Sequence, residues 1–206
     1  MGEKSPNNER DQMKYILTDI DDTILKFADG FQAWLTKHGH HTVGKIRDGY
    51  SVANALNCSE EEADKLIRQF SEDEGHMPYL EVEPDAAEIL PELEKMGYKF
   101  VAISACVNSD VTVRARHLNL KNAFPVDWHA VHCVGLHQSK DDHLRMYRNT
   151  WWVEDNAKHA LRGAAIGHHT FLLDRAYNSH LDIKDNPYRV KSWHDIFDEI
   201  VKHDKK

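Results

Sequence analysis

The chain has 206 residues, enough for one domain with a sizeable core or for one core plus a modest insertion. Hydrophobic residues make up 41% and charged residues 29%, and no apolar run approaches the roughly 20 residues that cross a bilayer. These proportions predict a soluble globular protein and argue against a membrane partner.

The net charge of −8 is concentrated in one part of the chain. Residues 28–83 contain eleven acidic and five basic side chains, whereas the remainder is nearly balanced. A protein that binds a long nucleic acid needs a basic face to neutralise phosphates, so this distribution argues against a long polynucleotide partner. A small anion held by a few local donors stays open as a partner.

The N-terminal residues 1–13 are polar and lack the apolar stretch of a secretory signal, so we expect a disordered tail there. Cys58, Cys106 and Cys133 form no CxxC pair and cannot all be paired, which suits a reducing compartment. Both features predict a cytoplasmic protein.

The first predicted strand, residues 14–18, leads into the acidic sequence DIDDT at residues 19–23. A buried strand cannot hide three carboxylates, so the acids should lie at its carboxyl end, where open α/β sheets bind ligands. A nucleophilic Asp19, an acid/base Asp21 and a shared Mg²⁺ would explain the pattern. The alternative is an acidic turn or a helix N-cap.

After the acidic cluster the apolar pattern becomes that of a helix. Phe31 and Trp34 share one helical face, and Ser59 with Glu62 forms a capping box that starts another helix. These signals, together with the charge shift, predict a small helical insertion at residues 28–83. The two aromatic side chains could form its core or contact a ligand.

Strands and helices alternate over the rest of the chain, which predicts a parallel sheet with right-handed crossovers. The fold class is therefore α/β, a Rossmann-like sheet with helices on both faces, with residues 14–27 and 84–206 as its core. The expected elements are a helix from Pro84 to Gly97, a strand at 98–103 ending on Ser104, a helix after Ser109, a strand at 129–134, a helix from Lys140 to Tyr147, a strand at 151–153, a helix at 157–165, a strand at 170–173 and a helix from Ser192 to about His203.

Three of the predicted strands end in polar side chains, and the carboxyl ends of parallel strands meet at one edge of the sheet. Carboxylate pairs around a hard cation, together with a hydroxyl and a lysine, are the groups that phosphoryl transfer requires. The residues concerned are Asp19 and Asp21, Ser104, Lys140, and Glu154 with Asp155.

With these motifs in order across residues 15–175, the chain resembles the haloacid dehalogenase superfamily of phosphotransferases. The insertion at 28–83 falls where that superfamily carries its C1 cap. The matching positions are residues 19–23 for motif one, Ser104 for motif two, Lys140 for motif three and Glu154-Asp155 for motif four.

This resemblance implies that Asp19 attacks phosphorus to form an aspartyl-phosphate, while Asp21 protonates the leaving alcohol and then activates water. Mg²⁺ would be held by Asp19, the backbone carbonyl of Asp21 and Asp155, with Glu154 acting through water. Because Asp21 must carry a proton when the leaving group departs, its pKa should be raised. An acid at position 21 also favours a phosphatase or mutase over a dehalogenase.

The same resemblance assigns phosphate binding to Ser104, to the backbone N–H of Ala105 and to Lys140. Each assignment has a structural alternative. Ser104 could cap the following helix, and Lys140 could belong to a solvated helix start. Glu154 and Asp155 could likewise precede a helix as capping residues.

The tail of the chain is similar to that of the 5′(3′)-deoxyribonucleotidase branch of the superfamily, in the run from Arg175 to Asn178 and in the later Arg189-Val190 and Trp193. This implies a nucleotide substrate, a (deoxy)nucleoside monophosphate for a 5′-nucleotidase. Its base could stack on aromatic residues of the insertion, and the expected substrate-pocket residues are Phe31, Trp34, Tyr50 and Arg175.

Other functions stay open at this stage. A phosphatase for sugar phosphates or other small metabolites would use the same motifs, as would a polynucleotide 3′-phosphatase or a non-enzymatic phospho-ligand binding protein. The histidines at residues 38–41 and 168–169 could bind zinc, but they lack cysteines at ligand spacing and an HExxH motif, which favours solvated histidines. The oligomeric state is not indicated.

Overall fold

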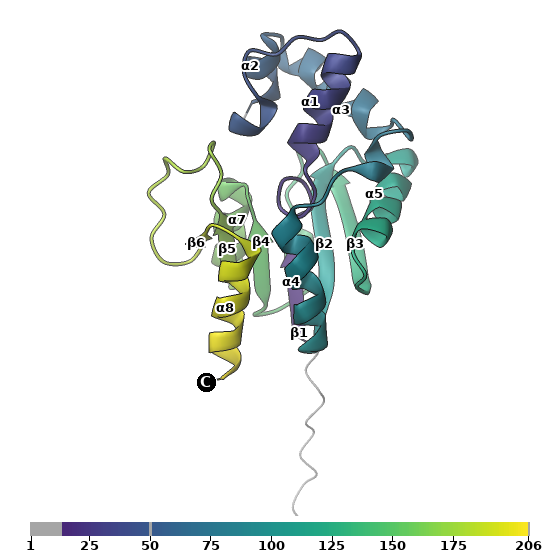
Figure 1. The fold of residues 1–206 in the computed structure, drawn as a ribbon. Helices are drawn as coiled ribbons and strands as arrows, with labels where there is room; N and C mark the ends of the chain where they lie inside the picture. The colour runs from purple at the N-terminus through teal and green to yellow at the C-terminus, as the bar shows by residue number, and fades with distance from the viewer. Residues whose placement is uncertain (1–13, 50, 206) are drawn as a thin grey trace, which may run out of the picture.

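A six-stranded parallel sheet forms the centre of the computed structural model, which describes residues 14–49 and 51–205 (Figure 1). The strand order is β3-β2-β1-β4-β5-β6, so β1 lies inside the sheet between β2 and β4. This arrangement confirms the predicted Rossmann-like α/β fold. The strands are β1 (Lys14–Thr18), β2 (Tyr98–Cys106), β3 (Trp128–Gly135), β4 (Trp151–Glu154), β5 (His169–Leu173) and β6 (Tyr188–Val190).

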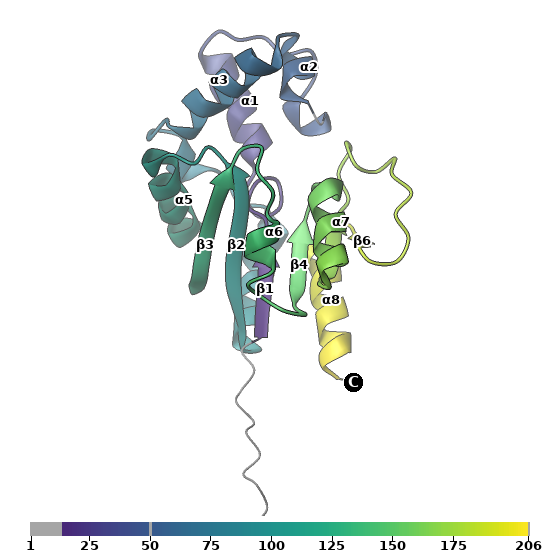
Figure 2. The same cartoon turned by 180° about the vertical axis from the view of Figure 1, so that it is seen from behind.

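Both faces of the sheet are covered by helices, which is why its inner strands are continuous apolar runs. Ile16 and Phe100 belong to the large core shared with α4, α5 and α8. Leu17 and Trp152 pack on the other face against α6, and α7 covers the neighbouring strand there (Figure 2). These helices are α4 (Pro84–Lys95), α5 (Asp110–Ala123), α6 (Asp141–Leu144), α7 (Ala157–Ile166) and α8 (Trp193–Asp204).

The chain between β1 and α4 is largely helical and stands over the carboxyl ends of the strands (Figure 1). We call residues 27–79 the helical segment. Its own core is aromatic, because Phe31 and Trp34 of α1 pack against Phe70 of α3. Its elements are α1 (Phe27–Lys37), the 3₁₀ turn η1 (Ile46–Asp48), α2 (Val52–Leu56), α3 (Glu60–Ser71) and the 3₁₀ turn η2 (Met77–Tyr79).

Two connections join the helical segment to the sheet, and they pair with each other. Leu25 and Val82 form an antiparallel bridge. The Lys26 N–H donates to the Glu81 carbonyl at 2.8 Å, and the Glu83 N–H donates to the carbonyl of Ile24 at 2.9 Å. Residues 24–26 and 81–83, which lead into and out of the helical segment, therefore form a short antiparallel ladder.

Three elements differ from the sequence predictions. Strand β2 does not end on Ser104 but continues to Cys106, because β3 runs beside it and keeps pairing with it. Helix α6 stops at Leu144, because the Arg145 N–H still bonds four residues back but those of Met146 and Tyr147 bond three residues back. Strand β6 was not predicted, because three residues are too short to show a period of two.

No helix in the described part of the chain is both long and apolar enough to cross a membrane. The predicted disordered tail, residues 1–13, lies outside the described residues.

Close packing of α7 on the sheet gives a test of the fold. A Cβ atom on Gly163 would lie 2.3 Å from Cδ1 of Trp152. We expect Gly163→Ala to lower the free energy of unfolding by about 1–2 kcal/mol, because overpacking costs more than the roughly 1 kcal/mol that alanine gains in a helix.

Urea denaturation of Gly163→Ala would measure this effect. Gly49→Ala is the matched control, because a Cβ on Gly49 has no neighbour within 4 Å and the backbone there is extended. A Gly163→Ala protein as stable as the wild type would contradict the packing described here.

Candidate active site

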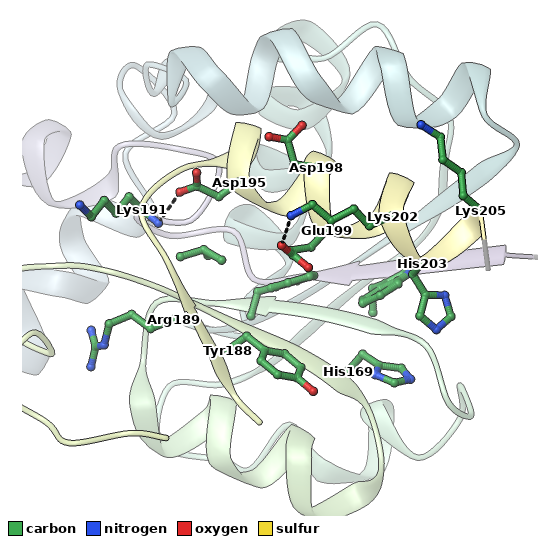
Figure 3. Close-up of a pocket in the computed structure, with 13 residues that line it drawn as sticks. His169, Tyr188, Arg189, Lys191, Asp195, Asp198, Glu199, Lys202, His203 and Lys205 are labelled. Atoms are coloured by element: carbon green, nitrogen blue, oxygen red, sulfur yellow. Dashed lines mark hydrogen bonds and ion pairs between the residues drawn. The ribbon is translucent and has the colours of Figure 1, made fainter. Parts of the chain in front are cut away.

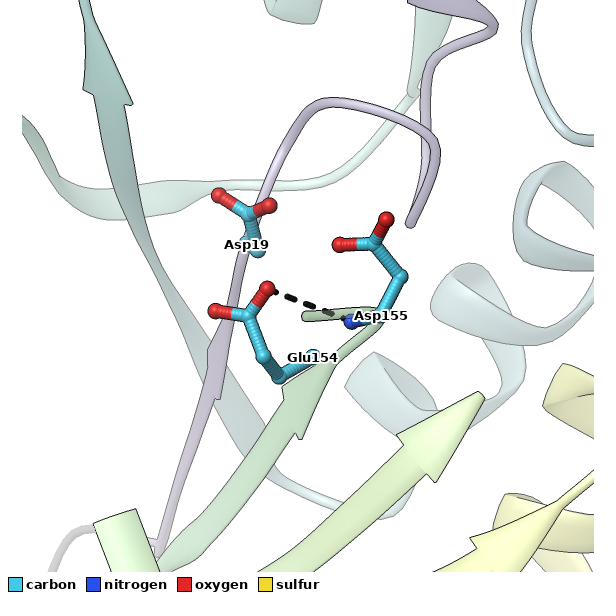
Figure 4. A group of neighbouring side chains, drawn as sticks. All are labelled: Asp19, Glu154 and Asp155. Carbon is cyan, nitrogen blue, oxygen red and sulfur yellow. Dashed lines mark hydrogen bonds between the residues drawn. The ribbon is translucent and has the colours of Figure 1, made fainter. Parts of the chain in front are cut away.

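Neighbouring strands bring the acidic residues together at the carboxyl edge of the sheet. Thr18, the last residue of β1, pairs with Val153 of β4, and the Asp19 N–H donates to the Val153 carbonyl at 2.9 Å. Glu154 is the last residue of β4 and Asp155 follows it. The side chains of Asp19, Glu154 and Asp155 therefore converge (Figure 4).

These three carboxylates form one compact, buried group. One oxygen from each lies within 4.8 Å of the others, and all three residues are buried. Burial raises the pKa of Glu154 well above its ordinary value, and the nearby Asp19 charge raises it further. The pKa of Asp155 is raised by the same two causes. A group of buried oxygens that repel one another fits a hard cation such as Mg²⁺, which takes oxygen ligands.

Lys140 is a buried cation that lies beside these three carboxylates. Its Nζ lies 2.6 Å from Oδ1 of Asp19 and 2.8 Å from Oε2 of Glu154, and the residue is only 2% exposed. Burial alone would lower the pKa of Lys140, but the Asp19 and Glu154 carboxylates raise it above its usual value. Lys140 is thus not in a solvated helix start, and its charge lies directly beside Asp19.

Asp21 lines the same cavity as Asp19 but has a different environment. Burial raises its pKa to about 6, although the Arg116 guanidinium opposes this shift. The shift has the direction expected from the sequence. Oδ2 of Asp21 accepts a hydrogen bond from Nη2 of Arg116 at 2.5 Å.

The second strand contributes Ser104 and Ala105 to the same edge. Ala105 lines the cavity, whereas Ser104 is fully buried and does not. The Ser104 hydroxyl has no hydrogen-bond partner among the described residues. A buried hydroxyl without a partner is compatible with the expected phosphate-binding role, which stays a prediction.

The tail of the chain supports the acidic loops. The Tyr177 hydroxyl donates to Oδ2 of Asp155, and Nδ2 of Asn178 donates to the Asp155 carbonyl at 2.7 Å. Nη2 of Arg175 donates to the Asp22 carbonyl at 2.6 Å. The run that resembles a nucleotidase tail therefore holds the site together, and Arg175 is not among the residues that line the cavity.

The predicted base-stacking residues do not face the cavity. Phe31 is fully buried and Trp34 is 5% exposed, and both lie in the core of the helical segment. The indole N–H of Trp34 donates to Asp73 at 2.8 Å. The stacking prediction is wrong for both residues, because the face they share is the one that α3 covers. Tyr50 lies outside the described residues.

The cavity itself has a volume of about 310 Å³. Its polar floor consists of Asp19, Asp21, Asp22, Glu154, Asp155 and Lys140. The walls are mainly apolar and come from both the sheet edge and the helical segment. They include Phe27, Ala28, Ile46, Val52 and Leu136, with Tyr177 and His159 at the side.

His159 and Tyr177 were missed at the sequence level. His159 lies in the first turn of α7, where its N–H and that of Lys158 donate to the capping side chain of Asn156. Burial, and then the charge of Lys140, lower the pKa of His159 to about 4, so its imidazole is neutral at pH 7. Its spacing of four residues from Asp155 was the signal that could have revealed it.

A larger hollow, of about 1110 Å³, lies between α8 and strands β4 to β6 (Figure 3). Its strand residues include Trp151 and His169, which begin β4 and β5, so it lies away from the acidic edge. Charged groups there bind one another, as Lys202 does with Glu199 at 2.6 Å. Among the described residues, the one group of histidine, cysteine and carboxylate side chains with metal-binding geometry is the carboxylate group at the acidic edge.

Comparison with known proteins finds a distant relative by sequence and several similar folds. No family model matches the chain. A curated relative, an uncharacterized 32.4 kDa protein from the Gp30-rIII intergenic region of Enterobacteria phage T4, is 26% identical over 195 residues, which are 90% of this chain and 69% of the relative.

Solved structures share its architecture. A haloacid dehalogenase-like hydrolase from Streptococcus pneumoniae superimposes with a TM-score of 0.62 at 14% identity, covering 91% of this chain and 98% of the other. The chain has the haloacid dehalogenase-like fold. A predicted phosphoglycolate phosphatase from Haemophilus somnus has this fold too, with a TM-score of 0.61, 17% identity and coverage of 92% and 98%. A D,D-heptose 1,7-bisphosphate phosphatase from B. bronchiseptica, solved with magnesium and phosphate, superimposes with a TM-score of 0.59 at 11% identity. The match covers 93% of this chain and 99% of the other.

The group formed by Asp19, Glu154 and Asp155 predicts that a bound metal ion stabilises this haloacid dehalogenase-like protein against thermal unfolding. We expect Mg²⁺ to raise the melting temperature, with a stabilisation of about 2.7 kcal/mol at one hundred times its Kd. Asp155→Asn should remove this response. Without metal, that variant should be at least as stable as the wild type, because it relieves repulsion between buried carboxylates.

Thermal unfolding in EDTA and in Mg²⁺ measures both effects. Asp142→Asn, at an exposed position, is the control and should keep the wild-type response. A wild-type protein whose melting temperature is the same with and without Mg²⁺ would argue against the site.

Tyr177 gives a second test, because its hydroxyl orients Asp155. We expect Tyr177→Phe to weaken Mg²⁺ binding by about 10- to 100-fold, the usual effect of removing a group that orients a metal ligand. Calorimetric titration would measure it, with Tyr188→Phe as the control because Tyr188 is 47% exposed and lies in the other hollow. Equal affinities for the two variants would contradict this role.

Proposed function

We propose that the chain is a Mg²⁺-dependent phosphomonoester hydrolase that works through an aspartyl-phosphate on Asp19. The observation that carries this proposal is the position of Asp19. Lys140 lies beside it at 2.6 Å, and Glu154 and Asp155 complete a buried carboxylate group at the floor of a cavity. The proposed nucleophile, a buried cation and the proposed metal ligands thus lie together.

In the first step, a carboxylate oxygen of Asp19 attacks phosphorus while the bond to the ester oxygen breaks. Negative charge spreads over the phosphoryl oxygens as this happens. Lys140 can offset part of it, because its ammonium group is held next to Asp19 by two carboxylates and stays protonated. The Ser104 hydroxyl and the Ala105 N–H are the proposed neutral donors.

Asp19, Asp155 and the Asp21 carbonyl are the proposed Mg²⁺ ligands, with Glu154 contributing through water. When bound, the ion supplies positive charge that lets the carboxylates stay ionised and polarises the phosphoryl group. The protein contributes by holding these ligands in place through Tyr177 and Asn178.

Asp21 is the proposed proton donor and acceptor. It gives a proton to the leaving oxygen in the first step and takes one from the attacking water in the second. A pKa of about 6 suits both tasks near neutral pH, because the protonated and ionised forms are then both populated.

A nucleoside monophosphate is the proposed substrate class. Lys140 is the one cationic side chain among the described residues that line the cavity, since the His159 imidazole is neutral, and this fits a substrate with a single phosphate. The apolar walls can take a ring, and Phe27 and Tyr177 supply aromatic surface in place of Phe31 and Trp34. We also propose that the helical segment acts as a cap that covers the bound ester.

The proposal predicts Mg²⁺-dependent phosphate release, and Asp19→Asn should abolish it because an amide cannot attack phosphorus. Phosphate release should be measured from deoxynucleoside and ribonucleoside 5′- and 3′-monophosphates, sugar phosphates and an oligonucleotide with a 3′-phosphate. Asp142→Asn is the matched control, since it makes the same change at an exposed position.

Near-normal turnover by Asp19→Asn would rule out Asp19 as the nucleophile. A wild-type protein that binds Mg²⁺ yet releases phosphate from none of these esters would favour a non-enzymatic phospho-ligand binding protein. Phosphate release from sugar phosphates alone would support the proposed phosphatase activity but contradict a nucleoside monophosphate as the substrate.

A further inference from the structure

Arg116 is a buried cation that the catalytic scheme above does not use. It lies on α5 and is fully buried, yet neither it nor any motif near it stands out in the sequence. Its Nη2 lies 2.5 Å from Oδ2 of Asp21, which is 95 residues away in the chain. The acid/base residue therefore has a charged partner that comes from a different element.

The surroundings of Arg116 give it few other partners. Its guanidinium carbon lies 5.5 Å from the centre of the Phe27 ring, a cation–π contact. Its Nε and Nη1 have no hydrogen-bond partner among the described residues. A buried guanidinium with unpaired N–H groups is costly, so its ion pair with Asp21 is the main compensation.

This ion pair makes the two oxygens of Asp21 different. Oδ2 accepts a hydrogen bond from Arg116. Oδ1 is buried and has no partner among the described residues. The Asp21 side chain as a whole is 21% exposed and lines the cavity, so the charge-assisted bond from Arg116 fixes the orientation of this carboxyl group at the cavity.

We propose that Arg116 is a positioning residue for Asp21: it holds Oδ2 and thereby fixes the orientation in which the Asp21 carboxyl group meets the leaving oxygen of the ester. The inference rests on the proposed phosphatase function and extends it to a residue outside its motifs. In the step concerned, an Asp19 oxygen bonds to phosphorus, the bond from phosphorus to the ester oxygen breaks, its electron pair stays on the leaving oxygen, and the proton of the Asp21 carboxyl group moves to that oxygen. Arg116 keeps its own protons throughout.

Two substrates with different leaving groups test this role. p-Nitrophenyl phosphate releases a stabilised anion that needs no proton, whereas 5′-dTMP or 2-glycerophosphate releases an alkoxide that does. We expect Arg116→Met to lower kcat/KM for the alkyl phosphate by about 100-fold and that for p-nitrophenyl phosphate by less than about tenfold. Arg116→Lys, which keeps the charge but loses the planar fork, should lie between wild type and Arg116→Met.

Thr112→Val is the structural control, because Thr112 is another fully buried polar residue of α5 but bonds to the Ser71 carbonyl and not to Asp21. Its effect should be equal for the two substrates. Equal losses for both substrates in Arg116→Met, or no loss in either, would overturn the positioning role. If Arg116→Met does not fold, the ratio measured for Arg116→Lys decides in the same way.

A crystal structure of Arg116→Met gives a readout that does not depend on turnover. The Asp21 carboxylate should adopt a different rotamer while Asp19 and Lys140 stay in place. An unmoved Asp21 would overturn the inference. If the wild type hydrolyses neither type of ester, the proposed function fails by itself, and the Asp21 rotamer still shows whether Arg116 positions that side chain.

Discussion

Repulsion between carboxylates is the constraint on which this structure depends. Asp19, Glu154 and Asp155 are buried within a few ångströms of one another, where ionised groups are least stable. Lys140 forms ion pairs with Asp19 and Glu154. The third carboxylate, that of Asp155, accepts hydrogen bonds from Thr23 and Tyr177. The sheet, the loop after β1 and the tail of the chain all hold these like charges together. A divalent cation would stabilise this arrangement.

The sequence predicts the group of three carboxylates because each of them ends or follows an apolar strand. Strands are visible as apolar runs, and the rule that parallel strands end at one edge brings Asp19 and Glu154 together without any coordinates. Arg116 and Tyr177 follow no such rule. They reach the site from a helix and a loop, and their partners are 95 and 22 residues away, so only the folded structure shows the contacts.

The aromatic residues show a different limit of sequence analysis. The helical spacing of Phe31 and Trp34 correctly predicts one buried face on α1, but periodicity does not say what that face is buried against. Phe70 of α3 covers it, so the helix turns its large rings inward. Phe27, one turn earlier, lines the cavity instead. Which aromatic meets a ligand thus depends on how two helices pack.

The paired connections between the sheet and the helical segment have a mechanical consequence. Two separate strands of chain could twist independently, but the bonds of Lys26 to Glu81 and of Glu83 to Ile24 tie them into one ribbon. Asp21 and Leu25 form a further bridge, so this ribbon begins in the loop that carries Asp21. The attachment of the helical segment and the position of Asp21, the proposed acid/base residue, therefore depend on the same few backbone bonds.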